Sequence, residues 1–262
     1  VTFTNKAAKE MKQRLIKMLS DATTIKFMET FGDLLPAAEL EKMNENDIPT
    51  IGTFHSVCVR ILRKTIHLLD YENSFAIYDV ADQQILMKRV MNELNIDPKR
   101  VNHKAVLSHI SNAKNQLIGP KDYSQFANDY FTEKVAEIYP VYQKALRMNN
   151  ALDFDDIIMN TVKLFKAFPD VLDKYQEKFK FISVDEYQDT NKAQYELINL
   201  LSAKYRNLCV IGDADQSIYS WRGATIQNIL DFEKDYTDTK IVKLEENYRS
   251  TQVILDASNE II

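Results

Sequence analysis

Two adjacent acids, Asp185 and Glu186, directly follow the apolar run 181–184. A short apolar run suits a buried strand, and in open α/β sheets sites form beyond the carboxyl ends of the strands. One carboxylate in such a place suits Mg²⁺, which prefers oxygen ligands and keeps much of its water. The other would project differently, because side chains alternate along a strand, and suits the polarisation of an attacking water. The pair indicates nucleotide hydrolysis, although a strand followed by the acidic first turn of a helix gives the same pattern.

A second apolar run, 208–211, is followed by an amide, two large rings and a guanidinium within seven residues: Gln216, Tyr219, Trp221 and Arg222. An amide such as Gln216 is suited to contact a phosphate. The rings of Tyr219 and Trp221 are suited to stack on bases, which contributes about 1–3 kcal/mol per base. The alternative for Trp221, the only tryptophan of the chain, is a role as an anchor of the core.

The elements that must position these groups are four short apolar runs, at 50–54, 181–184, 208–211 and 241–244. Their length and β-branched content predict buried strands of a parallel sheet. Each is followed by polar residues, which are His55, Asp185 with Glu186, Gly212 with Asp213, and the stretch 245–249. The sequence therefore predicts an α/β fold with a site at one edge of its sheet.

The middle of the chain has helical periodicity instead. Apolar residues recur at helical spacing over 57–69, over 85–94 before Pro98, from 106 to a break at Gly119-Pro120, and over 135–146. Proline and glycine of this kind end helices. Residues 71–150 are therefore predicted to be a helical insertion into an α/β domain that is built from the flanking parts.

Composition limits the classes of function. The net charge of −5 argues against a protein that holds nucleic acid through a blanket of positive charge, but it allows stacking rings and a few donors. No run of 18 apolar residues is present, so we expect no membrane span. Cys58 and Cys209 lie far apart in sequence and are predicted to be buried, reduced thiols of a cytoplasmic protein.

Some charged residues allow two interpretations. Asp153, Asp155 and Asp156 suit either a metal cluster of a nuclease or the N-cap and first turn of a helix that runs to Ala167. Lys114 and the pair 99–100 suit either contact with duplex DNA or a solvated surface. The remaining histidines are expected at the surface or in packing contacts: His67, His103 and His109.

Five segments, in this order along the chain, resemble motifs of the superfamily 1 DNA helicases of the UvrD/PcrA/Rep type. They are the two segments 1–8 and 51–56, which resemble single-strand-contacting motifs, 185–191, which resembles the Walker B motif, 212–224, which resembles the third helicase motif, and 246–250, which resembles an arginine-bearing motif. Within that family, the stretches 110–115 and 152–156 are most similar to PcrA-type proteins.

The resemblance implies a fold and an activity. Residues 1–70 and 151–239 would form a RecA-like parallel sheet, the motor domain 1A. Residues 71–150 would form its inserted all-helical subdomain 1B, and residues 240–262 would begin the second motor domain 2A. The implied activity is ATP hydrolysis coupled to 3′-to-5′ movement on single-stranded DNA during repair or replication. Single-stranded and duplex-junction DNA would be the partners, and protein partners are unknown.

The resemblance also implies roles for single residues around ATP and Mg²⁺. Asp185 would bind Mg²⁺, Glu186 would activate water, and Gln216 would couple the γ-phosphate to DNA. Tyr248 would pack on the adenine, and Arg249 would reach the γ-phosphate as an arginine finger, a contribution of about 10³–10⁵ in rate in other NTPases.

On the DNA side, the resemblance implies two kinds of contact. Phe3, Tyr219 and Trp221 would stack on single-stranded bases. Further residues would contact or line the strand: Asn5, Lys6, Thr53, His55 and Arg222.

A phosphate-binding loop with the pattern G-x-x-x-x-G-K-[ST] does not occur, since none of the five glycines precedes a lysine. In the family that loop lies just before the segment that matches Val1–Phe3. We therefore expect the chain to be an interior piece of a helicase that lacks this loop and most of the second motor domain, and that does not hydrolyse ATP alone. The competing hypotheses are a Mg²⁺-dependent nuclease and a non-catalytic DNA-binding or adaptor domain. An adaptor predicts degraded motor residues, whereas those named above are intact.

Overall fold

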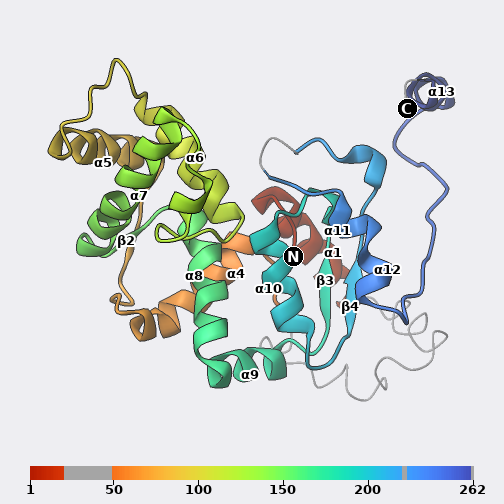
Figure 1. Cartoon of the computed structure of the whole chain (residues 1–262). Helices are drawn as coiled ribbons and strands as arrows, with labels where there is room; N and C mark the ends of the chain where they lie inside the picture. Colours follow the sequence, from red (N-terminus) through yellow and green to blue (C-terminus); the bar gives the residue numbers. More distant parts are fainter. Residues whose placement is uncertain (21–48, 220–222, 261–262) are drawn as a thin grey trace.

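A computed structural model describes residues 1–20, 49–219 and 223–260 of the chain (Figure 1). Its helices are α1 (Asn5–Ser20), α4 (Phe54–Thr65), α5 (Val80–Glu93), α6 (His103–Asn115), α7 (Tyr130–Met148), α8 (Phe154–Ala167), α9 (Pro169–Lys178), α10 (Lys192–Ser202), α11 (Gln227–Leu230), α12 (Phe232–Asp235) and α13 (Gln252–Asn259). Its strands are β1 (Ala76–Ile77), β2 (Ala151–Leu152), β3 (Ile182–Val184) and β4 (Leu208–Val210). Short 3-10 turns are η2 (Ile66–Leu69), η3 (Tyr123–Phe126), η4 (Tyr187–Asp189) and η5 (Ala214–Gln216).

Strands β3 and β4 pair in parallel, with Ile182 opposite Leu208 and Val184 opposite Val210. The backbone of Val1 lies on the other side of β3, because its oxygen accepts a hydrogen bond from the nitrogen of Asp185 at 3.0 Å. Thr2 in turn forms a parallel bridge with residue 53. Segments far apart in sequence therefore lie side by side, which confirms an α/β fold with parallel pairing.

Two of the four predicted strands differ from the expectation. In the run 50–54 only Thr53 forms a bridge. The run cannot continue as a strand, because the Thr53 hydroxyl accepts a hydrogen bond from the nitrogen of Ser56 and caps α4, which begins at Phe54. The run 241–244 forms no strand. Leu244 is 86% exposed, and no described segment pairs with this run, so that a strand there has neither a partner nor an apolar surface to cover.

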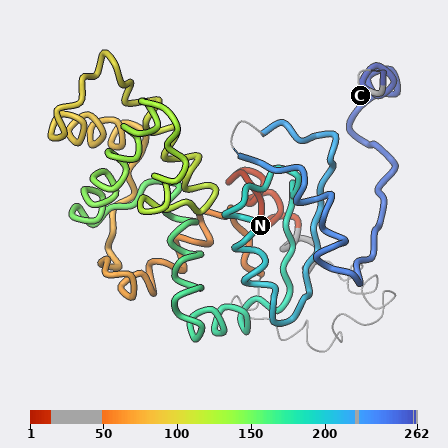
Figure 2. The backbone as a smooth tube through the Cα atoms, in the orientation of Figure 1, coloured from red at the N-terminus to blue at the C-terminus, as the bar shows by residue number. Residues whose placement is uncertain are grey.

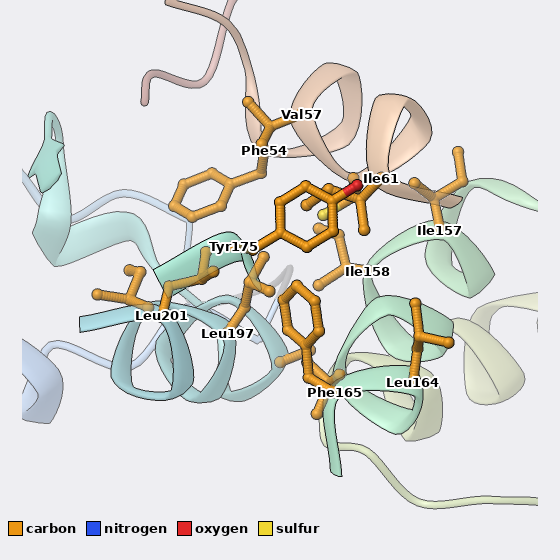
Figure 3. Packing of buried hydrophobic residues seen from close by; sticks show 14 of the residues in the cluster. Phe54, Val57, Ile61, Ile157, Ile158, Leu164, Phe165, Tyr175, Leu197 and Leu201 are labelled. Atoms are coloured by element: carbon orange, nitrogen blue, oxygen red, sulfur yellow. The ribbon is translucent and has the colours of Figure 1, made fainter. Parts of the chain in front are cut away.

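The first hydrophobic core lies where α4, α8, α9 and α10 pack together (Figure 3). Figure 3 shows Ile61 of α4, Phe165 of α8, Tyr175 of α9 and Leu197 of α10 directed toward one another. All four are buried, and each side chain of this size contributes about 1.5–3 kcal/mol when it leaves water. Residue 184 of β3 belongs to the same core, so these helices fix the position of the strand that precedes the acid pair.

A second hydrophobic core is built from α5, α6 and α7, the predicted helices of the middle of the chain (Figure 1). Met87, Ile110, Ile138 and Tyr142 are buried there. Side-chain caps begin each of these helices, namely Asp79, Asn102 and Asp129. The chain enters and leaves this group through β1 and β2, which pair in parallel.

The segment that follows residue 240 extends away from the rest of the molecule and ends in α13 (Figure 2). No helix of the described residues has both the length and the apolar content that a membrane span requires.

The two cysteines differ from each other. Cys58 is buried, as predicted, and burial raises the pKa of its thiol to about 12. The prediction for Cys209 was wrong, because its side chain is exposed. Cys209 alternates with Leu208 and Val210 along β4, and it points to the face of the strand that the first core does not cover.

Candidate functional site

Asp185 and Glu186 lie where β3 ends, at the carboxyl end of the parallel strands. Glu186 has a φ of 53° and is therefore in the left-handed region, which a residue other than glycine adopts at an energetic cost. The chain therefore turns at Glu186, directly after Asp185. The alternation of a continued strand, which the sequence suggested for the two side chains, does not apply, because the strand ends before Glu186.

The electrostatics of the pair suit a cation. Partial burial raises the pKa of the Asp185 carboxyl, and the neighbouring charge of Glu186 raises it further. A divalent cation would offset this repulsion and favour the ionised form. The chemistry of the two side chains fits Mg²⁺, since carboxylate oxygens are the donors that this ion prefers.

A chain of hydrogen bonds joins Glu186 to Gln216. Gln188 is buried and donates from its Nε2 to Oε2 of Glu186 at 2.8 Å. Its Oε1 accepts from the backbone nitrogen of Asp213 at 3.1 Å, and Oδ2 of Asp213 accepts from Nε2 of Gln216 at 2.7 Å. Two polar groups that the sequence places 30 residues apart are therefore linked through Gln188 and Asp213, and of these two the sequence analysis gave no role to Gln188.

Gly212 allows this link. A Cβ at this position would lie 2.6 Å from Oε1 of Gln188 and 2.9 Å from Cδ1 of Ile229. Such distances are shorter than van der Waals contact, so a side chain at residue 212 would displace the amide of Gln188 from its present position. The sequence pattern named Gly212 in the motif, and the structure gives the reason for it.

A cavity of about 540 Å³ lies between the two hydrophobic cores. Its walls come from the start of α1, the start of α4, the last turns of α6, the start of α8, the segment 189–194 and Tyr219. Five of the residues predicted to contact DNA line it, and these are Phe3, Asn5, Thr53, His55 and Tyr219. The structure thus brings together residues from three separate motifs.

Aromatic rings form part of the wall. The rings of His55 and Phe154 are stacked, with centroids 3.8 Å apart, and Phe3 packs edge-on against Phe54. Burial lowers the pKa of His55 to about 4, so its imidazole is neutral at pH 7 and acts as a flat, uncharged surface. Phe154 is 54% exposed and was missed by sequence reasoning. The available signal was an apolar ring between acids at the first position of a helix.

Among the described residues, the rest of the cavity wall is polar and carries no cation. Amides and hydroxyls line it, together with the carboxylates of Asp155 and Asp189. The carboxylate of Asp189 accepts the backbone N–H groups of Ile218 and Tyr219 and so holds the loop that carries the Tyr219 ring. A wall of rings, amides and two acids suits uncharged planar groups and disfavours phosphates.

Other predicted residues lie elsewhere. Lys6 is exposed on α1 and is not part of the cavity wall, and Trp221 and Arg222 lie outside the described residues. Tyr248 is 86% exposed, its hydroxyl donating to Glu246, and Arg249 is exposed beside it. Both belong to the segment that extends away from the body, so the structure does not bring them to the acid pair (Figure 2).

The acids of the 153–156 stretch have a structural role in the described part of the chain. Asp153 caps α8, as predicted, but it also forms a buried ion pair with Lys114, which contacts Asp156 as well. The two interpretations of Lys114, a duplex contact and a solvated surface, were therefore both wrong. Within the described residues no group of three or more His, Cys, Asp or Glu side chains could hold a metal ion. His67 is exposed, and His109 packs on the ring of Phe131.

Comparison with known proteins supplies the context of this geometry. Residues 1–237 match the family model described as the UvrD/REP helicase N-terminal domain. The chain is 48% identical over its whole length to the ATP-dependent DNA helicases PcrA of Staphylococcus aureus (strain NCTC 8325 / PS 47) and Bacillus subtilis (strain 168). It covers 33% of the first protein and 32% of the second, and thus spans about a third of the length of these relatives. The acid pair, the linked glutamine and the ring-lined cavity all lie within the matched residues. Because the match extends over most of its length, the chain belongs to the UvrD/REP helicase N-terminal domain family.

Proposed function

We propose that this chain is part of an ATP-dependent DNA helicase, and that it holds single-stranded DNA together with the acidic side of the ATP site. The observation that carries the proposal is the cavity, because it combines rings that can stack on bases with amides that can bond to their edges. The hydrogen-bonded link from Glu186 to Gln216 supports the second half of the proposal. The relatives named above carry the same activity in their names.

The proposal includes the domain organisation. Residues 1–70 and 151–239 would form the RecA-like motor domain 1A, and its parallel strands support this. Residues 71–150 would form the helical subdomain 1B, which has its own hydrophobic core and is joined through the paired strands β1 and β2. Residues 240–262 would begin the second motor domain, 2A.

Around the nucleotide, each residue has a proposed role. Asp185 holds Mg²⁺, and this ion would supply charge neutralisation at the phosphates. Glu186 accepts a proton from the attacking water. Gln216 contacts the γ-phosphate and reports its presence through Asp213 to Gln188. Tyr248 packs on the adenine, and Arg249 reaches the γ-phosphate once 2A packs against 1A.

For DNA, the rings of Phe3, Tyr219 and Trp221 are proposed to stack on unpaired bases, and Phe154 joins them because its exposed ring faces the same cavity. Asn5, Thr53 and His55 line the strand from the cavity wall. Lys6, which lies on α1 outside that wall, and Arg222 would contact the phosphates. Movement in the 3′-to-5′ direction, action at duplex junctions in repair or replication, and a cytoplasmic location complete the proposal.

Fluorescence anisotropy with a labelled oligothymidylate and a labelled duplex of equal length tests the DNA part. The single strand is expected to bind the 262-residue chain more tightly than the duplex, and Tyr219→Ala is expected to weaken its binding about 5- to 150-fold, which corresponds to one lost stacking contact. Equal affinity for both DNA forms, or equal affinity of wild type and variant, contradicts the proposal. Mg²⁺-dependent cleavage of either DNA without ATP would support the nuclease hypothesis instead.

The nucleotide part needs a protein that contains this chain together with a phosphate-binding loop and motor domain 2A. Its ATP hydrolysis is expected to rise when single-stranded DNA is added, and Glu186→Gln is expected to abolish this rise while ATP still binds. Turnover that persists in E186Q would exclude Glu186 as the base.

A further inference from the structure

Asn115, the last residue of α6, places its side-chain amide between two other helices. Its Nδ2 donates to Oδ1 of Asp155 in the first turn of α8, at 3.3 Å. Its Oδ1 accepts from Nδ2 of Asn191, which precedes α10, at 2.8 Å. All three residues line the cavity that we propose to hold DNA. The amide therefore joins the helical core of α5–α7 to the core that carries the acid pair.

The chemistry of the three groups fixes the orientation of this contact. An ionised carboxylate only accepts hydrogen bonds, so Asp155 takes the amino side of Asn115 and leaves its Oδ1 for Asn191. Oδ1 of Asn191 accepts from the backbone nitrogen of Gln194 at 2.9 Å and so caps α10. Rotation of either side-chain amide by half a turn would place two donors or two acceptors against each other. The three hydrogen bonds can therefore form in only one orientation of the two amides.

Asn191 directly follows the turn behind the acid pair in the chain. Within that turn, the nitrogen of Asp189 donates to the oxygen of Glu186 at 2.9 Å, and the nitrogen of Thr190, the neighbour of Asn191, donates to the oxygen of Tyr187 at 3.2 Å. On its other side, Asn191 forms an antiparallel bridge with Ala224, the last residue of the segment that resembles the third helicase motif. A displacement of Asn191 would therefore move both the turn behind Glu186 and that segment.

From this juxtaposition we propose that Asn115 is a positioning residue, which couples occupation of the DNA cavity to the acid pair by holding Asn191 in place. A base in the cavity lies against the amides of Asn115 and Asn191, and the fixed contact between them transmits its presence to the turn that carries Glu186. The inference rests on the proposed function. It gives the helical core a part in stimulation of ATP hydrolysis in addition to contact with DNA.

The test uses the complete helicase with two substitutions that break the same contact from opposite sides. Asn115→Ala removes the amide, and Asn191→Asp removes the donor but keeps an oxygen that caps α10. Each variant is expected to lower ATP turnover at saturating single-stranded DNA about tenfold. This size lies within the range of interaction energies that are found between residues in contact. The DNA concentration for half-maximal stimulation is expected to change less than about threefold. The double variant is expected to be no slower than the single ones.

Asn112→Ala is the matched control. Asn112 lies one turn earlier on α6 and lines the same cavity, but its side chain makes no hydrogen bond within the described part of the chain. Its replacement is expected to shift the DNA concentration for half-maximal stimulation and to leave the saturated turnover at its wild-type value. Equal loss of turnover in N112A, or independent losses that multiply in the double variant, would overturn the inference, and so would full stimulation in N115A and N191D. A wild-type protein without any DNA-stimulated turnover would overturn the proposed function and the inference together.

Discussion

The ammonium group of Lys114 lies 2.6 Å from Oδ2 of Asp153, and both side chains are buried. Asp156 is 2.9 Å from the same nitrogen, and the Tyr142 hydroxyl donates to Asp153 at 3.2 Å. Burial raises the pKa of Asp153 to about 7, and the charge of Asp156 adds to this effect. A single cation thus holds two carboxylates at the junction of α6 and α8.

Replacement of Lys114 by methionine is expected to lower the free energy of unfolding by about 3–5 kcal/mol, because two buried carboxylates then lack their cation. Urea denaturation of the 262-residue chain measures this. Lys104→Met is the control, since Lys104 lies exposed on the same helix, and its effect is expected to stay within about 0.5 kcal/mol. Equal stability of K114M and K104M would show that the ion pair is not needed.

Stability is expected to depend on pH through His55. Burial lowers the pKa of His55 to about 4, whereas the value in the unfolded chain is about 6.5. Between these values the unfolded chain holds a proton that the folded chain lacks. The free energy of unfolding therefore rises with pH in this window, by at most about 1.4 kcal/mol per pH unit. The contribution of His55 to stability is lost as the pH falls through the same window.

Urea denaturation of wild type and His55→Gln, at several values between about pH 4.5 and pH 7, isolates this contribution. The advantage of the wild type over H55Q is expected to shrink as the pH falls. Asp153 titrates in both proteins, and its contribution cancels in the difference. A difference that stays constant with pH would show that the imidazole is not shielded from water.

Gly212→Ala is expected to destabilise the chain by about 1–3 kcal/mol, because the added methyl group overlaps Gln188 and Ile229. In the complete helicase the same change is expected to lower DNA-stimulated ATP turnover, since Gln188 links Glu186 to Asp213. Thermal unfolding and ATP hydrolysis measure the two effects. Gly119→Ala is the control, where a Cβ meets only Asp122 at 3.5 Å, and a loss of similar size in that variant would contradict the steric explanation.

Phe154→Ala is expected to weaken binding of single-stranded DNA about 5- to 150-fold, the equivalent of one stacked base. The ring is half exposed and stacks on His55, so its loss is expected to lower the free energy of unfolding by about 0.5–1.5 kcal/mol, the contribution of one ring pair. Anisotropy titration at one fixed salt concentration compares it with Phe126→Ala, which removes an equally exposed ring that does not line the cavity. Identical DNA affinities of F154A and F126A would exclude Phe154 from the DNA site.

The sequence predicts best what depends on neighbouring residues. Asp153 was expected to cap a helix that runs to Ala167, and it does, because an N-cap bonds to groups within three residues. Strand β3 and the acids behind it were predicted from one apolar run, and the structure confirms the position of that strand. For the cavity, the sequence could predict only some of the residues that line it. Its shape was not predictable, because it depends on how the two hydrophobic cores pack against each other.

Properties that depend on distant partners were not predictable. The burial of Lys114 depends on Asp153, which lies 39 residues away in sequence. Cys209 has the residue type and neighbours of a buried strand, but burial of its side of β4 depends on what covers that face. The run 241–244 has strand composition and lacks a pairing strand among the described residues. Pairing and burial are tertiary properties, whereas composition is local.

The position of Val1 and Thr2 in the sheet has a consequence for biosynthesis. Their backbone bonds on one side to Gly52 and on the other to Ser183 and Asp185. At about 5–20 residues per second, a ribosome needs roughly 10–40 s to make the intervening chain. During that interval the segment is an unpaired edge that can add to the strands of other nascent chains, and shielding by a chaperone at this stage would favour the correct pairing.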